Sequence, residues 1–297
     1  MSMSIRRLAY GLGAEVLGVD PAGEIGAATL GQLVKAWEDH QVLVFRGVEW
    51  SLGQQVAFSR RFGELELHPL KYLRNPDCPE VFEVTNRLVN GKPSETGEVG
   101  RMWHSDGAYT VKPPTASFLH CRQIPESGGT TWFCNMYLAY ERLSATMQGI
   151  VDQLEVVNDL FGSGKTTAFI SGRDANKAGE ESAVNPPVVQ PMVRVHPGTG
   201  RKALFLNPAA TRRVLGMNED ESDALLKLLF QQCTKPEIVY CHYWRPNDLV
   251  MWDNRCTNHL APKDYDGSQI RQMFRTTLVG EPHGRYLAEP AGMAVGA

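Results

Sequence analysis

Apolar residues follow two kinds of pattern along the chain. Eight short runs rich in β-branched and apolar residues predict strands. Four longer segments carry apolar residues at three- and four-residue spacing, which predicts helices. The predicted strands are Ala14 to Val19, Val42 to Phe45, Val81 to Thr85, Ala116 to Cys121, Val188 to Val195, Ala203 to Leu206, Leu249 to Trp252 and Met273 to Val279. The predicted helices are Ala28 to Asp39, Gln54 to Phe62, Met136 to Gln148 and Glu219 to Gln232, the last beginning after Asn218 as a capping residue.

The order of these elements predicts the fold class. Helices interrupt the strands without the regular alternation of a doubly wound sheet, so we expect a mainly β protein with flanking helices, an antiparallel barrel or jelly roll. One domain over residues 1–297 fits this order better than two. The stretch 162–187 is rich in Gly, Ser, Lys, Asn and Ala, which favours a surface loop or lid, with an interdomain linker as the alternative.

Composition narrows the class of partner. The 30 Lys and Arg residues nearly balance the 33 Asp and Glu residues, so no broad positive surface is available for nucleic acid. No apolar run reaches the length of about 18 residues that a membrane helix needs, and the segment Met1 to Tyr10 lacks the apolar core of a signal peptide. We therefore expect a cytoplasmic protein that contacts no membrane. Its six cysteines form no C-x-x-C pair, which favours reduced, structural thiols.

Two distant segments carry candidate metal ligands. His104 and Asp106 lie two residues apart, so their side chains share a face of an extended strand. A second imidazole would complete the two-His-one-carboxylate set that suits non-haem Fe(II). Such a tripeptide is common by chance, and a surface His beside a solvated Asp is the ordinary interpretation. The segment from Leu249 to His259 strengthens the metal hypothesis, because an apolar strand there runs into a polar turn ending on His, with Arg271 and Arg275 beyond it.

At these residues the chain resembles the family of taurine dioxygenase and 2,4-dichlorophenoxyacetate dioxygenase. Several motifs follow in the family's order over nearly the whole length. They are Leu12 to Asp20, Val42 to Gly47, Phe58 to Gly63, Trp103 to Asp106, Gly128 to Thr131, His196 to Arg201 and Trp252 to Arg255. The fold that the resemblance implies is the double-stranded β-helix, a jelly roll.

The resemblance also implies roles for individual residues. It makes His104, Asp106 and His259 the Fe(II) ligands and the catalytic centre, and it makes Arg271, with Thr131, the partner of the far carboxylate of 2-oxoglutarate. Arg271 lies one residue farther from the metal His than in the taurine enzyme, so Arg275 is a rival for that role. The implied reaction consumes 2-oxoglutarate and O2, releases succinate and CO2, and hydroxylates the substrate, with C–S or C–O cleavage where the hydroxylated product collapses.

The residues around that centre indicate which class of substrate to expect. His68 matches a sulfonate-binding residue of the taurine enzyme, so His68 and Arg275 would clamp a small sulfonate or carboxylate, although His68 alone is more often a structural loop residue. Lys71 would repel an ammonium group if it reached the pocket rather than solvent. The remaining candidates, each of which more often belongs to a core, are the aromatic residues Trp103, Tyr109, Phe161 and Phe169.

Other functions stay open on the sequence. Relatives with the same motifs oxidise amino acids or natural-product intermediates, which is the main enzymatic alternative. A barrel-fold binding protein is the non-enzymatic alternative, and it would be expected to lack a metal ligand or the cosubstrate arginine. The carboxylate of Asp106 argues against halogenation, and the near-neutral composition argues against a nucleic-acid demethylase. The resemblance further implies a homo-oligomer, either a dimer or a tetramer.

Overall fold

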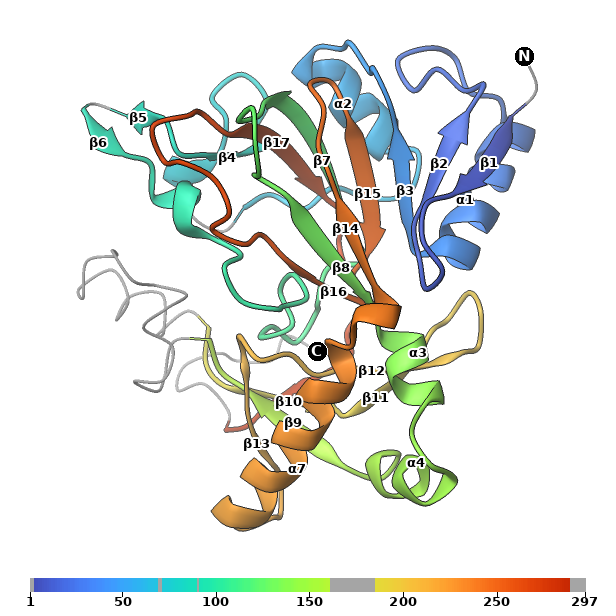
Figure 1. Ribbon diagram of the computed structural model, residues 1–297, viewed down its shortest axis with the longest axis vertical. Coiled ribbons are helices and arrows are strands. Elements are labelled where there is room, and N and C mark those ends of the chain that lie inside the picture. The colour runs from blue at the N-terminus through green and yellow to red at the C-terminus, as the bar shows by residue number, and fades with distance from the viewer. Residues whose placement is uncertain (1–2, 69–70, 90, 161–184, 289–297) are drawn as a thin grey trace, which may run out of the picture.

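Two facing antiparallel sheets form the upper part of the molecule in the computed structural model, which describes residues 3–68, 71–89, 91–160 and 185–288 (Figure 1). The larger sheet has the order β1 (Ser4–Arg7), β2 (Ala14–Leu17), β3 (Val42–Phe45), β15 (Leu249–Asp253), β7 (Ala116–Gln123), β17 (Gln272–Thr277) and β4 (Phe82–Thr85). The smaller sheet has the order β14 (Val239–His242), β8 (Thr131–Asn135) and β16 (Thr257–Leu260). All pairings in these sheets are antiparallel except that of β2 with β3.

A further sheet and two hairpins complete the strands. The sheet has the order β13 (Thr211–Val214), β9 (Glu155–Asn158), β10 (Val188–Pro191) and β18 (Arg285–Tyr286). The hairpins are β11 (Val193–Val195) with β12 (Lys202–Leu204), and β5 (Leu88–Val89) with β6 (Lys92–Pro93). The helices are α1 (Ala27–His40), α2 (Leu52–Ser59), α3 (Met136–Glu141), α4 (Ala145–Val151) and α7 (Glu219–Cys233), with short 3-10 turns at Lys71–Leu73, Glu95–Glu98 and Pro236–Ile238. This arrangement confirms a mainly β fold with flanking helices.

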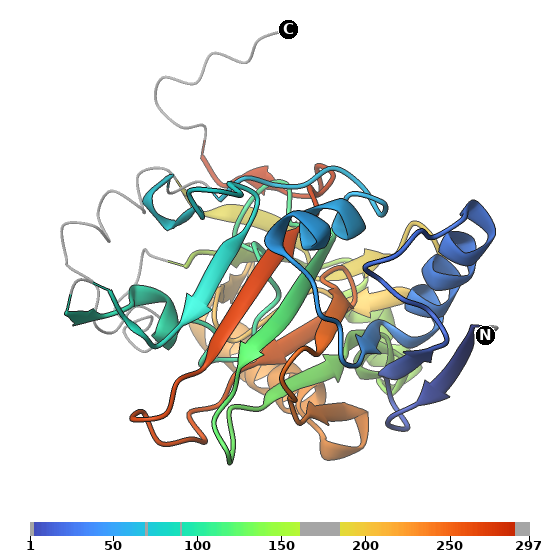
Figure 2. The same cartoon turned by 90° about the horizontal axis from the view of Figure 1, so that it is seen from above.

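Strands β3 and β15 of the larger sheet are buried on both faces, which explains their continuous apolar sequences. In β15, Leu249 and Met251 face a cluster that α1 and α2 cover, whereas Val250 and Trp252 face the smaller sheet. Figure 2 shows α2 lying across the outer face of this sheet. Because successive side chains of a strand point to opposite faces, a strand between two apolar layers loses the usual alternation. These runs were therefore easy to predict from the sequence.

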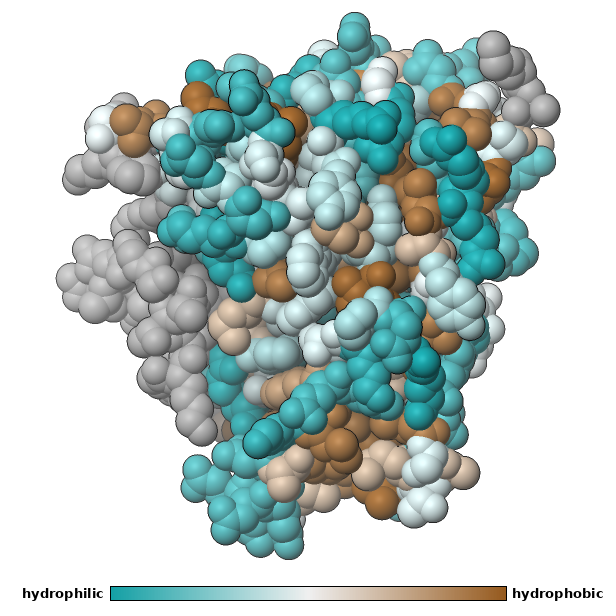
Figure 3. Space-filling model, viewed as in Figure 1, coloured by the Kyte–Doolittle hydropathy of each residue, from teal (hydrophilic) through white to brown (hydrophobic). Residues whose placement is uncertain are grey.

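A third apolar cluster lies away from the two facing sheets, around α3, α4 and α7. Figure 3 shows mostly polar side chains on this face of the molecule and a group of apolar ones in its lower part, between α7 and α4. Ile150 on α4 and Leu228 on α7 are 43% and 47% exposed. Among the described helices, none is both long enough and apolar enough to cross a membrane.

Some boundaries differ from those predicted. The helix predicted from Met136 to Gln148 is two helices, because Ser144 caps α4 by accepting a hydrogen bond from the amide of Met147. The strand predicted from Val188 to Val195 is divided between β10 and β11 at the buried Met192, whose amide bonds to the carbonyl of Leu154. The loop or lid predicted at 162–187 lies outside the described residues except for its last three positions.

Candidate active site

Two candidate metal ligands are paired directly through their backbones. The amide of His104 donates to the carbonyl of His259 at 3.0 Å, and the amide of His259 donates to the carbonyl of His104 at 2.7 Å. His259 lies on β16, whereas His104 lies in an extended segment that forms an isolated bridge beside it. The ring centroids are 4.0 Å apart. The chain therefore fixes the two imidazoles relative to each other without any ligand.

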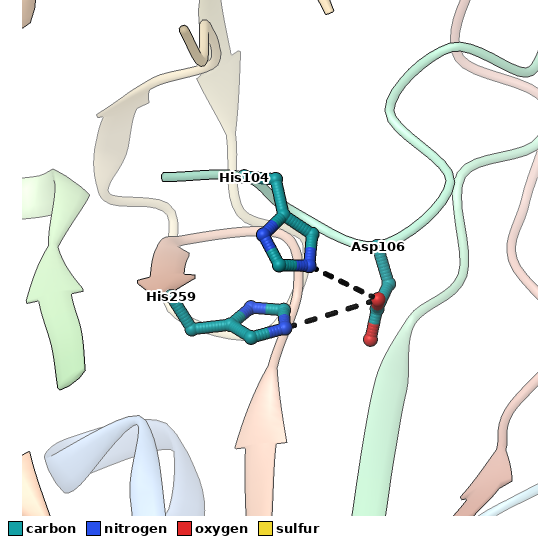
Figure 4. A group of neighbouring side chains, drawn as sticks. All are labelled: His104, Asp106 and His259. Atoms are coloured by element: carbon teal, nitrogen blue, oxygen red, sulfur yellow. Dashed lines mark ion pairs between the residues drawn. The ribbon is translucent and has the colours of Figure 1, made fainter. Parts of the chain in front are cut away.

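Both imidazoles turn toward Asp106. The Nε2 atoms of His104 and His259 lie 3.7 and 3.8 Å from Asp106 Oδ1, and the three ligand atoms lie within 4.8 Å of one another (Figure 4). The Asp106 carboxylate is held from two further sides. Ser117 Oγ donates to its Oδ2 at 2.6 Å, and Arg275 donates to its Oδ1 at 3.1 Å.

The surroundings favour the protonation states that bind a cation. Burial lowers the pKa of His104 and, more strongly, that of His259, so both imidazoles are neutral at pH 7. Burial alone would raise the pKa of Asp106, but Arg275, the two histidines and the Ser117 hydrogen bond outweigh it and hold that pKa well below its usual value. The group is therefore two neutral nitrogen ligands and one anionic oxygen ligand.

This donor set fits a divalent transition metal. His104 Nδ1 lies 2.8 Å from the carbonyl of Met102, a contact that places the ring proton on Nδ1 and directs the Nε2 lone pair toward Asp106. The ligand atoms are close enough for one small ion to contact all three. Two imidazoles and one carboxylate on one side of an ion suit non-haem Fe(II).

Arg271 and Thr131 form a second element of the site. The Arg271 guanidinium donates from Nε to the carbonyl of Gly129 at 3.1 Å and from NH2 to Thr131 Oγ1 at 3.3 Å. Both side chains are buried, and both line the same cavity as the three candidate ligands. The cavity thus has a fixed guanidinium and a hydroxyl group on the wall formed by the start of β8.

The turn before β8 sets the position of Thr131. Gly128 has a φ of +77°, and a Cβ atom there would lie 2.0 Å from the carbonyl oxygen of Asp264. The carboxylate of Asp264 in turn accepts a hydrogen bond from the amide of Gly129 at 2.9 Å. Only glycine allows this close approach at position 128, so the backbone requires the first glycine of the Gly-Gly-Thr-Thr motif.

Arg275 lies on β17 and lines the same cavity. Besides its bond to Asp106, its guanidinium carbon lies 4.8 Å from the ring centroid of Phe82. Its Nε is buried and has no hydrogen-bond partner among the residues that the structure describes. The structure therefore places Arg271 by Thr131 and Arg275 by the metal group.

The cavity has a volume of about 230 Å³ and brings together most of the predicted site residues. His68 and Tyr109 line it, and the His68 ring stacks on Phe82 with centroids 4.7 Å apart. Lys71 is exposed at the start of a 3-10 turn and does not line the cavity. Trp103 packs against the cluster around α3 and α7 instead. Phe161 and Phe169 lie outside the described residues.

Two residues of this region were missed from the sequence. Glu66 lines the cavity two residues before His68, and the spacing of two in an extended segment was the available signal. Trp244 donates from its indole Nε1 to Thr131 Oγ1 at 2.9 Å. Nothing in the sequence relates Trp244 to Thr131, because the pairing of β14 with β8 brings them together.

A second group of possible ligands, His196, Asp253 and Cys256, is structural. His196 Nδ1 accepts hydrogen bonds from the amides of Gly198 and Thr199, and its Nε2 lies 3.0 Å from Asp253 Oδ2. Arg255 also donates to both oxygens of Asp253. Both ring nitrogens of His196 are therefore used within the protein, and this group stabilises the turn after β15.

Known proteins are similar to this chain over most of its length. A family profile described as taurine catabolism dioxygenase TauD, TfdA family matches residues 4–277. The alpha-ketoglutarate-dependent 2,4-dichlorophenoxyacetate dioxygenase of Cupriavidus pinatubonensis is 33% identical over 90% of this chain and 94% of its own. The pentalenolactone F synthase of Streptomyces arenae is 30% identical over 94% of this chain and 96% of its own.

A solved structure extends the likeness to three dimensions. The crystal structure of AAD-2 in complex with Mn(II) and N-oxalylglycine has a TM-score of 0.79 and 31% identity over 95% of this chain and 100% of that one. With two facing sheets here and structural neighbours of this type, the predicted jelly roll is confirmed.

Proposed function

We propose, from the premise that the chain belongs to the taurine catabolism dioxygenase TauD, TfdA family, that it holds Fe(II) on His104, Asp106 and His259 and oxidises a small organic molecule that carries an anionic group. Membership of this family makes the protein a 2-oxoglutarate-dependent dioxygenase, with O2 as its other cosubstrate. The observation that carries the proposal is the reciprocal backbone pairing of the two histidines, with both Nε2 atoms facing one carboxylate.

The residues that line the cavity have separate roles in the proposed reaction. When bound, Fe(II) supplies the activation of O2 that oxidises a C–H bond, and 2-oxoglutarate leaves as succinate and CO2. Arg271 and the Thr131 hydroxyl would bind the far carboxylate of 2-oxoglutarate, since a guanidinium pairs with a carboxylate through two hydrogen bonds. Apolar side chains such as Leu119, Leu160 and Trp252 line the rest of the cavity and limit its water.

Arg275 and His68 support an anionic group on the substrate. Both line the cavity, Arg275 lies beside Asp106, and the name of one relative describes a dioxygenase of an aryloxyacetate, which is a carboxylate. We propose a sulfonate or carboxylate bound at this position, with C–S or C–O cleavage when the oxidised carbon bears sulfur or oxygen. Oxidation of a natural-product intermediate is the second candidate, because a relative of similar identity is named for such a compound.

The test is anaerobic addition of Fe(II) and 2-oxoglutarate to the wild type and to His104→Ala. We expect the weak visible charge-transfer band of the chelate in the wild type and its loss in the variant, followed by succinate release in air when a substrate is present. Folded wild type without this band would contradict the proposed function and favour a barrel-fold binding protein.

A further inference from the structure

Glu66 lies in a short extended segment that continues the larger sheet beyond β17. Leu65 and Leu278 form an isolated antiparallel bridge, and the amide of Glu66 donates to the carbonyl of Thr277 at 2.8 Å. In this register Glu66 lies opposite Thr277, whereas Phe82 of β4 lies opposite Arg275 and the His68 ring stacks on Phe82. Side chains two apart on a strand share a face, and Glu66, His68, Arg275 and Thr277 all line the cavity.

The carboxyl group of Glu66 is not used by the fold. It is partly buried, and within the described part of the chain it makes neither a hydrogen bond nor a salt bridge. The other acidic residues of the cavity are engaged: Glu80 pairs with Arg60, and Asp106 pairs with Arg275 and Ser117. Burial raises the pKa of Glu66, the charge of Arg275 opposes that rise, and Asp106 adds to it.

The charges in the occupied site indicate which kind of chemical group on the substrate Glu66 would bind. With Fe(II) and 2-oxoglutarate bound as proposed above, the ferrous ion and Arg271 together balance Asp106 and the two carboxylates of the cosubstrate. The substrate part of the cavity then contains one guanidinium, Arg275, and one carboxyl group, Glu66, that are left to bind substrate. A simple monoanion would satisfy Arg275 but would leave Glu66 desolvated and unpaired, which is unfavourable.

We propose that Glu66 is a substrate-specificity residue that binds an ammonium group, and that the substrate is a small dipolar molecule with its anionic group at Arg275 and His68. This inference rests on the proposed function and names the substrate class of the same site. Along a strand, residues two apart are separated by roughly 7 Å. The side chains of Glu66 and Arg275 are long enough to reach across that distance and contact two charged groups of one small molecule. In an amino acid or an aminosulfonate, these two groups lie only a few bonds apart.

The experiment compares pairs of compounds that differ only in the amino group. The pairs are taurine with ethanesulfonate, β-alanine with propionate, and phenylalanine with phenylpropionate. Succinate release in air and the shift of the anaerobic Fe(II) chelate band are measured for the wild type, Glu66→Gln and Glu64→Gln. Glu64 is the matched control, because it is exposed in the same segment and does not line this cavity.

In the wild type and Glu64→Gln, we expect the amino member of at least one pair to be preferred by about tenfold or more in kcat/KM, which is ~1.4 kcal/mol. Glu66→Gln should lose or invert that preference while it keeps the chelate band and gains affinity for the simple anion. If Glu66→Gln lowered kcat/KM equally for both members of each pair, the role of Glu66 would be purely structural and the proposal would be overturned. The proposal would also be overturned if the wild type formed the chelate but preferred the simple anions, or if no compound of any pair stimulated succinate release. A missing chelate would instead refute the proposed function.

Discussion

The hydroxyl group of Thr131 illustrates how single hydrogen bonds determine what this cavity can bind. Its oxygen accepts from Trp244 Nε1 at 2.9 Å and from Arg271 NH2 at 3.3 Å. A hydroxyl oxygen has two lone pairs and one proton to donate. With both lone pairs used, the proton is left for an acceptor in the cavity, which suits a carboxylate.

Trp244→Phe should therefore weaken 2-oxoglutarate binding without removing any group that touches it. Loss of one neutral hydrogen bond corresponds to about 1 kcal/mol, so we expect KM for 2-oxoglutarate to rise about fivefold with kcat little changed. Trp132→Phe is the control, since Trp132 donates to Thr130 rather than to Thr131. Equal increases of KM in both variants would contradict the orienting role.

His120 on β7 should make the fold sensitive to acid. Burial lowers its pKa to about 4, whereas an unfolded chain has the ordinary value of about 6.5. The unfolded state then binds more protons between these values, so stability is full above pH ~6.5 and falls as the pH drops toward about 4. At pH 5 this residue alone should cost about 2 kcal/mol.

His120→Gln, which keeps a donor near the carbonyl of Val48, removes this titration. The loss of unfolding free energy between pH 7 and pH 5, measured with denaturant, should be smaller in the variant by that amount. An unchanged loss would show that other groups dominate the acid sensitivity.

The candidate site residues were proposed from the sequence because their motifs follow in the order of the family that the chain resembles. The segments around His104, Thr131, His259 and Arg271 were singled out in this way, and the structure brings their side chains to one cavity. Glu66 and Trp244 were missed because their placement depends on which strands pair. Strand pairing is a property of the tertiary structure and has no local signature.

The secondary-structure elements also differ in how well they could be predicted from the sequence. Strands between two apolar layers, such as β3 and β15, were predicted almost to the residue. The strands of the smaller sheet, β8, β14 and β16, were not predicted, because polar residues such as Thr131, His242 and His259 occupy them. Where a strand supplies the cavity wall, its chemistry replaces the apolar pattern on which prediction depends.

The start of α7 was predicted from the Asn218 signal and is present as a full capping box. Asn218 Oδ1 accepts from the amide of Glu221, and a carboxylate oxygen of Glu221 accepts from the amide of Asn218 in return. Asn218→Ala should lower the free energy of unfolding by about 1 kcal/mol, whereas Asn218→Ser should be nearly neutral because serine caps as well. Chemical denaturation measures both, and equal losses would contradict a capping role.

At the scale of the whole molecule, the proposed metal joins segments far apart in the chain. His104 and Asp106 precede β7, whereas His259 lies on β16 of the smaller sheet. A ligand that binds only the folded state stabilises it, by about 2.7 kcal/mol at a concentration one hundred times Kd. We expect Mn(II) with 2-oxoglutarate to raise Tm by several degrees in the wild type.

The same addition should leave Tm of His259→Ala nearly unchanged, because one ligand is gone. His68→Ala is the matched control, since His68 lines the cavity without belonging to the metal group, and its Tm should still rise. Thermal unfolding measures Tm in all three proteins. An equal rise of Tm in all three would place the metal elsewhere.

The mutual backbone bonds of His104 and His259 have a consequence for which metal the protein carries in a cell. A site assembled by the fold itself can exchange its ion without unfolding, and two imidazoles with one carboxylate suit Fe(II) without selecting it by affinity over the later divalent metals. Copper, nickel and zinc generally bind such ligands more tightly than ferrous iron does. Mismetallation is therefore expected of the proposed site, and its occupancy by iron would depend on the supply of free metals when the chain folds and afterwards.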